Sequence, residues 1–456
     1  MPKMSKVIKE EVGDVKNILS RIKRRDFSGN EGQAVKNSAY QLTTLIASKI
    51  GSIIFTIILA RLLLPELFGL YGLALSTILL FASFADLGIG STILAFISKH
   101  IGDKDQKKTK AYFSKIFSMK ILLIALSSLA LLISAGFIAN SYYAKPIALA
   151  LIMGVFYILF SQFSYFFESL FQAVNDFRPV FIKEVIFQLI RLILLPVIIL
   201  YFLYLDSSWF IAVVLLSISF SYLVPFIYLF VMSRKKLSFL KEQGGTLSKK
   251  ENKEIRSFLI PLSTVALSGI LFGYVDMILL GHYVASEFLG FYNAALNLAG
   301  SLFAIIAFSS AALFPIFGRL KGKQLERGFR KSRRMVLLIS ILAGIIIYFT
   351  ASWAIKLIYG AEYGPAIGIL KIFSFLWISF PLIALYQSYY VSQGDTKSFS
   401  KIIIFSTILN IILSFILITS FLKYGGYYSI LGAALAAGIS KLVFLVLLVI
   451  FRKKHA

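Results

Sequence analysis

Cysteine is absent from this sequence of 456 residues. The absence excludes disulfides, thiolate metal sites and cysteine nucleophiles. Histidine is almost as scarce, and the scatter of His100, His282 and His455 along the chain argues against a histidine metal cluster. Charged residues are also few, at 15% of the chain against about 25% in soluble proteins. A secretory signal peptide is not expected, because the first 36 residues are mostly polar.

Apolar residues make up 58% of the chain, and the mean hydropathy is +0.84. This excess of apolar surface requires a solvent that is itself apolar. A stretch of about 20 apolar residues is long enough to cross a bilayer core of about 30 Å. We therefore predict an all-α membrane protein with about twelve spans, at 38–62, 69–97, 117–139, 146–173, 180–203, 209–232, 257–281, 287–317, 335–353, 366–390, 401–422 and 428–451.

The basic residues predict the orientation of these spans. The chain has 47 Lys and Arg against 21 Asp and Glu, a net charge of +26. Of the 47, 39 fall on the side that holds both termini and the longer loops, and four on the other side. Because basic residues are retained in cytoplasmic loops, we predict a multi-pass cell-membrane protein with both termini in the cytoplasm. The charge is then explained by topology and by anionic membrane lipids, and nucleic acid is not an expected partner.

The longest inner loop divides the spans into two sets of six. The predicted organisation is a cytoplasmic segment 1–36, a first lobe 37–232, a linker 233–256, a second lobe 257–451 and a tail 452–456. Apolar residues recur at three- and four-residue spacing within 1–36, opposite a basic face. This pattern is typical of an amphipathic helix lying on the inner leaflet, and a solvated tail is the alternative.

A repeated corner links the two lobes. Glu66, Gly69 and Tyr71 follow the first span, and Glu287, Gly290 and Tyr292 follow the seventh at a constant offset of 221. Six spans in each half bring both halves into the membrane from the same side. The repeat therefore predicts two lobes related by a pseudo-two-fold axis along the membrane normal. Each glycine also has a structural interpretation, because it allows a helix to begin in a cramped turn.

Ionisable residues inside spans are costly and are candidates for function. The deep cations are Lys49, Arg191, Lys371 and Lys441, and the anions are Asp86, Glu168, Glu184 and Asp276. Glu184, Gln188 and Arg191 recur on one helical face, and further polar stripes include Gln41 on the first span and Glu168 on the fourth. These stripes predict a wet, cationic cavity lined by Lys49, Arg191, Glu184, Gln188, Gln41, Glu168 and Lys371. The structural alternative is that the same residues pair with one another to hold helices together.

The first corner reads Arg61-Leu-Leu-Leu-Pro65-Glu-Leu-Phe-Gly69-Leu-Tyr71, and it is followed by Ala85-Asp-Leu-Gly-Ile-Gly90. With Tyr274-Val-Asp-Met-Ile-Leu-Leu-Gly281 in the second half, these motifs resemble the polysaccharide-biosynthesis transporters, the Wzx-like flippases of lipid-linked oligosaccharides. The similarity covers about residues 36–450 and extends to the wider superfamily of multidrug, oligosaccharidyl-lipid and polysaccharide exporters. It implies a V-shaped pair of lobes that alternate between inward-open and outward-open states.

The resemblance implies a transporter rather than an enzyme, whose cargo is a glycan on a polyprenyl phosphate or diphosphate. A cationic cavity would bind the anionic head group. No cofactor or metal is expected, although Asp86 or Asp276 could couple transport to Na⁺ or H⁺. Glycan assembly enzymes are potential partners, and a monomer is the simplest state. The alternatives are a cation-coupled multidrug exporter of the same superfamily and a membrane glycosyltransferase or ligase. Short outer loops argue against the latter.

Overall fold

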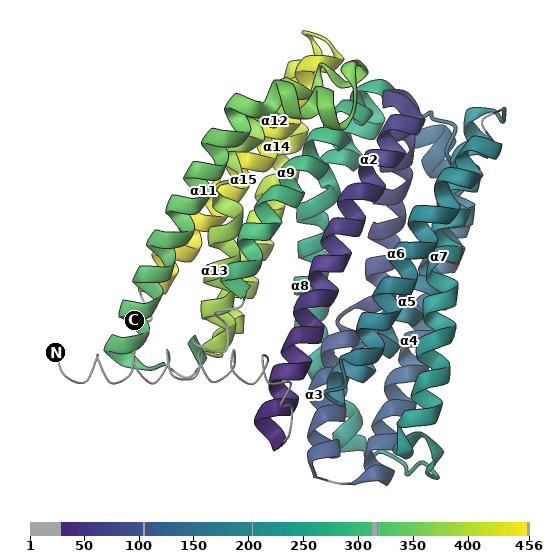
Figure 1. Cartoon of the computed structure of the whole chain (residues 1–456), viewed down its shortest axis with the longest axis vertical. Coiled ribbons are helices and arrows are strands. Elements are labelled where there is room, and N and C mark those ends of the chain that lie inside the picture. Colours follow the sequence, from purple (N-terminus) through teal and green to yellow (C-terminus); the bar gives the residue numbers. More distant parts are fainter. Residues whose placement is uncertain (1–28, 104, 203, 312–316, 319, 454–456) are drawn as a thin grey trace.

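The computed structural model describes residues 29–103, 105–202, 204–311, 317–318 and 320–453. Over these residues the chain is helical, with no strand. The predicted amphipathic segment falls largely within 1–28, outside the described residues. Figure 1 shows two groups of long helices that approach each other at one end of the molecule and lean apart toward the other.

Helix α2 (Gly29–Asp86) holds the first two predicted spans, because it is divided at a kink rather than by a loop. Leu64 has φ 56° and ψ 173°, which no helical residue adopts, and Pro65 follows it. Proline cannot donate a backbone hydrogen bond, and its ring disfavours helical backbone in the residue before it. The proline therefore ends one span and begins the next.

The first half of the chain continues through five further helices. They are α3 (Ile89–Gly102), α4 (Gln106–Gly136) with the short π-helix η1 (Phe137–Tyr142), α5 (Ala148–Ala173), α6 (Arg178–Tyr201) and α7 (Ser207–Lys236), followed by the 3₁₀ turn η2 (Ser238–Lys241). Asp105 and Asp206 cap the starts of α4 and α7 by accepting backbone N–H hydrogen bonds. Such caps satisfy donors that the helix itself leaves free.

The second half has the same order of long helices. They are α8 (Lys249–Tyr283), α9 (Ser286–Ala311), α11 (Gly322–Ile358) with η3 (Ala361–Tyr363), α12 (Ala366–Leu376), α13 (Ser379–Ser392), α14 (Thr396–Leu422) and α15 (Gly426–Lys453). A capping box between Ser248 and Glu251 begins α8. In this box, each residue's side chain bonds the backbone of the other.

Ten apolar helical segments among the described residues are long enough to cross a membrane, and α12 with α13 forms an eleventh, bent by 40°. One of the ten, Ala39–Gly102, contains the kink at Leu64 and therefore counts as two spans. The total of twelve confirms the sequence prediction. The second span differs from the expectation in shape, because Gly88 in left-handed backbone (φ 83°) separates the end of α2 from α3.

Large apolar side chains cover the outside of the bundles. Ile133 and Phe349 are 75% and 79% exposed, and many leucines and isoleucines on α4, α6 and α11 are also exposed. A soluble protein rarely exposes contiguous apolar patches larger than a few hundred Å². The outer surface is therefore suited to hydrocarbon rather than to water.

The two repeat corners lie against each other across the halves. A β-carbon on Gly69 would overlap the Ser286 carbonyl, and one on Gly290 would overlap the Pro65 carbonyl. Because 65 and 286, like 69 and 290, differ by 221, the two contacts are equivalent under exchange of the halves. Such reciprocity is the property of a two-fold interface. It agrees with the pseudo-two-fold relation that the repeat predicted.

Polar contacts beside the corners follow the same two-fold relation, because matched residues of each half contact the other half. Arg61 donates from Nε to the Ile358 carbonyl oxygen over 2.8 Å, while Nδ1 of His282, the residue matched to Arg61, lies 2.5 Å from the Tyr142 carbonyl oxygen. The neighbouring carbonyl oxygens are also matched, since Tyr363 donates to that of Ala60 over 2.8 Å and Lys145 to that of Gly281 over 2.7 Å. The halves are thus tied together at one end of the molecule, the end predicted to face outward.

Candidate functional site

A cavity of about 1110 Å³ lies between the two halves. Its walls come mainly from α2 and α5 on one side and from α8, α9, α13 and α15 on the other. Polar side chains are spread over both walls: Lys49, Ser52, Thr56, Ser83, Asp86, Gln162, Tyr165 and Ser169 from the first half, and Tyr274, Asp276, Asn297, Ser301, Gln387 and Lys441 from the second. The cavity can therefore hold a polar molecule away from hydrocarbon.

Lys49 is the most accessible cation of this cavity. It lies on α2 one turn before Ser52, and its side chain is exposed. No hydrogen bond or ion pair joins its ammonium group to any other residue that the structure describes. The sequence prediction that Lys49 contributes to the cavity thus agrees with its position, and its charge is available to a bound anion.

Asp86, predicted to bind a coupling ion, lies at the cavity wall beside a buried lysine that the sequence analysis missed. The Lys120 Nζ donates to the Asp86 carboxylate over 3.0 Å and to the Gln162 amide oxygen over 2.7 Å. Lys120 is wholly buried, although its charge was counted with those of the cytoplasmic side. A buried charge is tolerated when it is paired and hydrogen-bonded, as it is here.

Asp276 lies on the opposite wall and is held by two hydroxyl groups. Ser414 donates to Oδ1 over 2.5 Å and Tyr292 to Oδ2 over 3.2 Å. Tyr292, expected only as a structural residue of the corner, is therefore also a partner of this carboxylate. These bonds fix the buried carboxylate at the end of a polar chain that continues through Asn410 and Ser440.

Lys441 shares this wall with Asp276. Its ammonium group lies 4.8 Å from the ring centre of Trp377 and 5.1 Å from that of Phe272. The aromatic faces contact it, whereas Asp276 attracts it over a longer distance, since no described carboxylate oxygen comes within 4.0 Å. Aromatic faces attract a cation electrostatically. Because they accept no conventional hydrogen bond, the N–H donors of Lys441 remain available to a ligand in the cavity.

Arg191 lies one layer behind the cavity wall. The residue is 9% exposed, and its guanidinium group stacks 4.1 Å from the ring centre of Phe55. Nη2 donates to Gln188 over 2.6 Å and to the wall residue Ser52 over 3.3 Å. Gln188 in turn donates to Glu184 over 2.7 Å. The predicted stripe thus forms a continuous chain of hydrogen bonds that reaches the cavity through Ser52.

Glu168 and Glu184 are joined by Lys183, a second buried cation that the sequence analysis did not predict as part of a site. The Lys183 Nζ lies 2.8 Å from Glu168 Oε2 and 3.3 Å from Glu184 Oε2. Gln172 also donates to Glu168 over 3.2 Å. This cluster links α5 to α6, as the structural alternative expected of these carboxylates, but the cation that pairs with them is Lys183 rather than Arg191.

The two remaining predicted residues are placed away from the cavity lining. Gln41 is exposed near the start of α2, and Lys371 on α12 is partly buried with its ammonium group 5.2 Å from the ring centre of Tyr348. Neither side chain belongs to the residues that line the cavity. The described residues also contain no group of three or more His, Asp or Glu that could hold a metal ion.

Comparison with known proteins identifies the family to which this chain belongs. Residues 34–321 match the polysaccharide biosynthesis protein family. The chain belongs to that family. Residues 261–416 also match the MatE family. A protein of Escherichia coli (strain K12) that carries the provisional name of O-antigen transporter is 27% identical over 391 residues, which are 82% of this chain and 87% of that protein.

Solved structures share the fold of this family member. An inward-facing multidrug resistance MATE family transporter of the MOP superfamily has a TM-score of 0.72 at 15% identity, over 90% of this chain and 96% of that one. The lipid II flippase MurJ in an inward closed conformation has a TM-score of 0.70 at 16% identity, over 91% and 87%. With its membrane spans and family, the chain is a multi-pass membrane transporter rather than an enzyme.

Proposed function

We propose that this protein moves a lipid-linked oligosaccharide, carried on a polyprenyl phosphate or diphosphate, from the cytoplasmic to the outer leaflet. The observation that carries the proposal is the polar cavity between the halves, which offers the ammonium groups of Lys49 and Lys441 without a paired carboxylate within 4.0 Å. Membership of the polysaccharide biosynthesis family and the similarity to the Escherichia coli protein support this cargo.

The cavity suits each part of such a cargo. Lys49 and Lys441 would attract the phosphate groups, since charge-assisted hydrogen bonds to phosphate are about twice as strong as neutral ones. Hydroxyl and amide groups such as those of Ser52, Gln162 and Asn297 would replace water around the sugars. The polyprenyl tail would remain in the bilayer between the leaning halves. Arg191 would add positive potential from behind the wall and orient Ser52.

Transport would follow from alternation of the two halves about the corners. The positive-inside rule predicts that both termini are cytoplasmic, so the tied end at Arg61 and His282 would face outward. The described arrangement would then be closed on the outer side and would receive cargo from the cytoplasmic leaflet. A single chain supplies both walls of the cavity, and we therefore propose a monomer that works beside glycan assembly enzymes.

Coupling to an ion gradient is part of the proposal. Asp276 is the better placed of the two predicted carboxylates, because Ser414 and Tyr292 hold it at the cavity and no lysine neutralises it within 4.0 Å. Asp86 is already paired with Lys120. Binding of Na⁺ or H⁺ to Asp276 would change the charge of the second wall and thereby bias the position of that half.

The test is export of a lipid-linked glycan by cells that lack their own flippase. Expression of this protein should restore surface glycan, and Arg191→Ala at a normal protein level should abolish the restoration. Full export by Arg191→Ala would remove the assigned role of that residue. Failure of the unaltered protein to move any of several lipid-linked glycans would remove the proposed function.

A cation-coupled multidrug exporter is the second candidate. The match of residues 261–416 to the MatE family favours it, and the cavity carboxylates Asp86 and Asp276 could attract cationic drugs. Drug susceptibility of the same cells separates the two proposals. Strong resistance to several cationic drugs without any change in surface glycan would select the exporter.

A further inference from the structure

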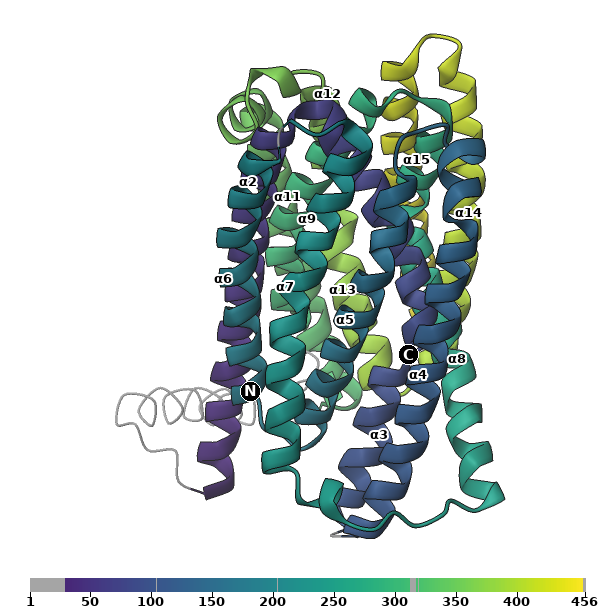
Figure 2. The ribbon, with the colours of Figure 1, turned by 90° about the vertical axis from the view of Figure 1, so that its right-hand side faces the viewer.

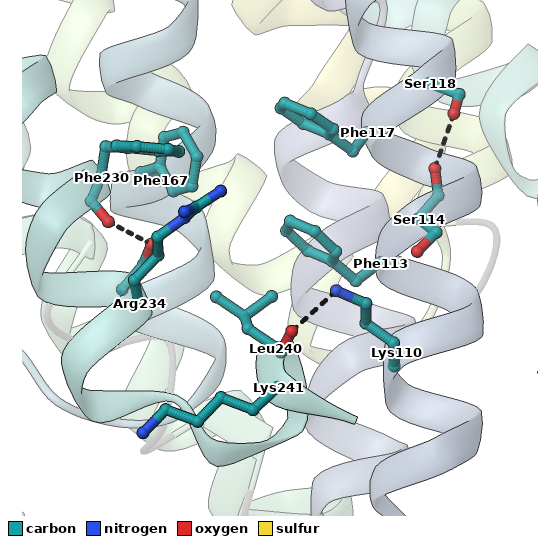
Figure 3. A pocket seen from close by; sticks show the side chains of 11 residues that line it. Lys110, Phe113, Ser114, Phe117, Ser118, Phe167, Phe230, Arg234, Leu240 and Lys241 are labelled. Carbon is teal, nitrogen blue, oxygen red and sulfur yellow. Dashed lines mark hydrogen bonds between the residues drawn. The ribbon is translucent and has the colours of Figure 1, made fainter. Parts of the chain in front are cut away.

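A second cleft lies on the outside of the first half, away from the central cavity. It has a volume of about 630 Å³ and lies between α4 and α7, with α5 behind and η2 at one end (Figure 3). The face of the molecule that carries these helices is turned toward the viewer in Figure 2. No residue lines both this cleft and the central cavity. The cleft is therefore a separate site, and its role does not depend on the proposed transport function.

The inner part of the cleft is aromatic. Phe113 and Phe117 stack on α4 with ring centres 5.5 Å apart, and Phe230 on α7 meets the buried Phe167 of α5 at 5.5 Å. The four rings line the space between the two helices. Phe117, Phe167 and Phe230 fall within the predicted spans 117–139, 146–173 and 209–232, so this inner part of the groove would face hydrocarbon. An alkyl chain fits such a surface.

The rim of the cleft at the loop end carries three cations. Figure 3 shows Lys110, Arg234 and Lys241 around the mouth. The Lys110 Nζ donates to the Leu240 carbonyl oxygen over 2.9 Å, and the Arg234 guanidinium lies 4.9 Å from the ring centre of Phe230. No described carboxylate oxygen lies within 4.0 Å of any of the three charges. Neighbouring carboxylates are already engaged, Asp176 by Lys236 and Glu251 by Lys108.

We propose that this cleft binds one anionic phospholipid of the surrounding leaflet. The phosphate would sit among Lys110, Arg234 and Lys241, and an acyl chain would follow Phe117 and Phe230 toward the bilayer centre. Both parts of the occupant are needed, because a soluble anion leaves the aromatic groove empty and a neutral lipid leaves three unpaired cations. Basic pockets between spans at the cytoplasmic surface are known to suit anionic head groups, and the volume lies within the range of about 300–1,000 Å³ typical of ligand sites.

Phospholipid binding can be measured on the full-length protein in detergent by native mass spectrometry with added phosphatidylglycerol. The unaltered protein should retain one phosphatidylglycerol and should not retain zwitterionic phosphatidylcholine under the same conditions. The double substitution Arg234→Gln with Lys241→Gln should weaken retention by roughly 10- to 30-fold, since each basic group at a membrane surface contributes roughly a factor of five. Both residues are exposed, so the variant should fold.

The matched control is Lys397→Gln with Lys401→Gln. These two exposed residues lie at the start of α14, in the other half but on the same predicted side. The control removes the same charge and should retain the lipid within about twofold. A third variant, Ser114→Glu, places a carboxylate at the rim of the cleft and should also weaken retention.

Three outcomes would overturn the proposal. Equal losses in the cleft variant and in the control would show general attraction between a basic protein and acidic lipid. Displacement of the lipid by inorganic phosphate at equal concentration would assign the site to a free anion. Preference for undecaprenyl phosphate, with no competition from phosphatidylglycerol, would assign the cleft to the transported lipid.

Discussion

Lys120 donates a hydrogen bond over 3.0 Å to Asp86, across the boundary between α4 and the end of α2. The lysine is wholly buried, whereas the aspartate side chain is 39% exposed and borders the central cavity. The pair therefore connects the interior of the first half to the surface that a cargo would meet. Any change in the charge of Asp86 therefore alters the electrostatic stabilisation of the Lys120 ammonium group, which has no access to water.

Asp86→Asn should destabilise the protein, because it removes the negative charge paired with the buried Lys120 ammonium group and leaves only neutral amide acceptors, at the new asparagine and at Gln162. Removing one partner of a fully buried ion pair costs about 3 kcal/mol or more in free energy of unfolding. Because Asp86 is partly exposed, we expect a smaller cost here, about 2 kcal/mol. Thermal unfolding in detergent measures the change as a lower midpoint temperature.

The double substitution Asp86→Asn with Lys120→Met should recover most of this stability, since it removes both the charge and its need for a partner. If the double variant were as unstable as the sum of the single ones, the two residues would not be energetically coupled. That result would contradict the pairing described here.

Lys49→Gln should weaken transport of a diphosphate-linked cargo by about tenfold. The expected loss follows from one charge-assisted hydrogen bond, worth about 1.5–3 kcal/mol. Rates of flipping in proteoliposomes, measured over a range of cargo concentrations, give the effect. Lys371→Gln is the control, because that lysine is also deep in a span but lies outside the cavity lining. Equal effects of both substitutions would argue against a direct role for Lys49.

A disulfide between Gly72→Cys and Asn293→Cys should lock the corner end and stop transport until it is reduced. A β-carbon on Gly72 would overlap the Asn293 side chain, so the new thiols face each other across the halves. The chain has no cysteine of its own, and the cross-link therefore forms without competitors. Transport before and after oxidation, and again after reduction, is the measurement.

The matched control for this cross-link lies within one half. A β-carbon on Gly154 would overlap Ile78, and Gly154→Cys with Ile78→Cys joins two helices of the same half. If each half moves as a unit, this second disulfide should leave transport nearly unchanged. Loss of transport with both cross-links would contradict motion of the halves as units.

Asp276→Asn should make transport insensitive to the coupling gradient. Asparagine keeps the shape, and its single amide oxygen can still accept from one of the two hydroxyl groups of Ser414 and Tyr292, but it lacks the charge that would bind Na⁺ or exchange H⁺. Uptake into proteoliposomes with imposed Na⁺ or pH gradients tests this. Asp206→Asn, an N-cap substitution at the start of α7, should respond like the unaltered protein. A normal response of Asp276→Asn would move the coupling site elsewhere.

The spans could be predicted from sequence because hydrocarbon thickness sets their length. The partners of individual charges could not, because partners come from other helices. Lys120 was left out of the charges inside spans, although it continues a series with Tyr112, Ile116 and Ile124, all buried on one face of α4. That four-residue spacing was a signal of burial. For Lys183, the adjacent Glu184 indicated a possible ion pair. Its bond to Glu168 could not be predicted, because it depends on how α5 and α6 pack.

Lys371 and Lys441 illustrate the same limit. Both lie within apolar spans, and the sequence treats them alike. The packing of α12 and α15 decides that Lys441 meets the cavity while Lys371 lies against Tyr348. The repeated corner was visible from its matched residues, yet only the fold reveals that Gly69 and Gly290 are each small because the other half lies against them.

The reciprocal corner has an evolutionary consequence. A polypeptide of half this length with one such corner would present the same glycine and carbonyl to an identical copy, and two copies could close as a homodimer. When the two copies are joined in one chain, matched positions are encoded separately and can differ in sequence. Phe55 and Asp276 are 221 residues apart, and one stacks on Arg191 while the other is a buried carboxylate. At this matched pair of positions the fused halves have thus diverged, one packing against a cation and the other carrying an anion.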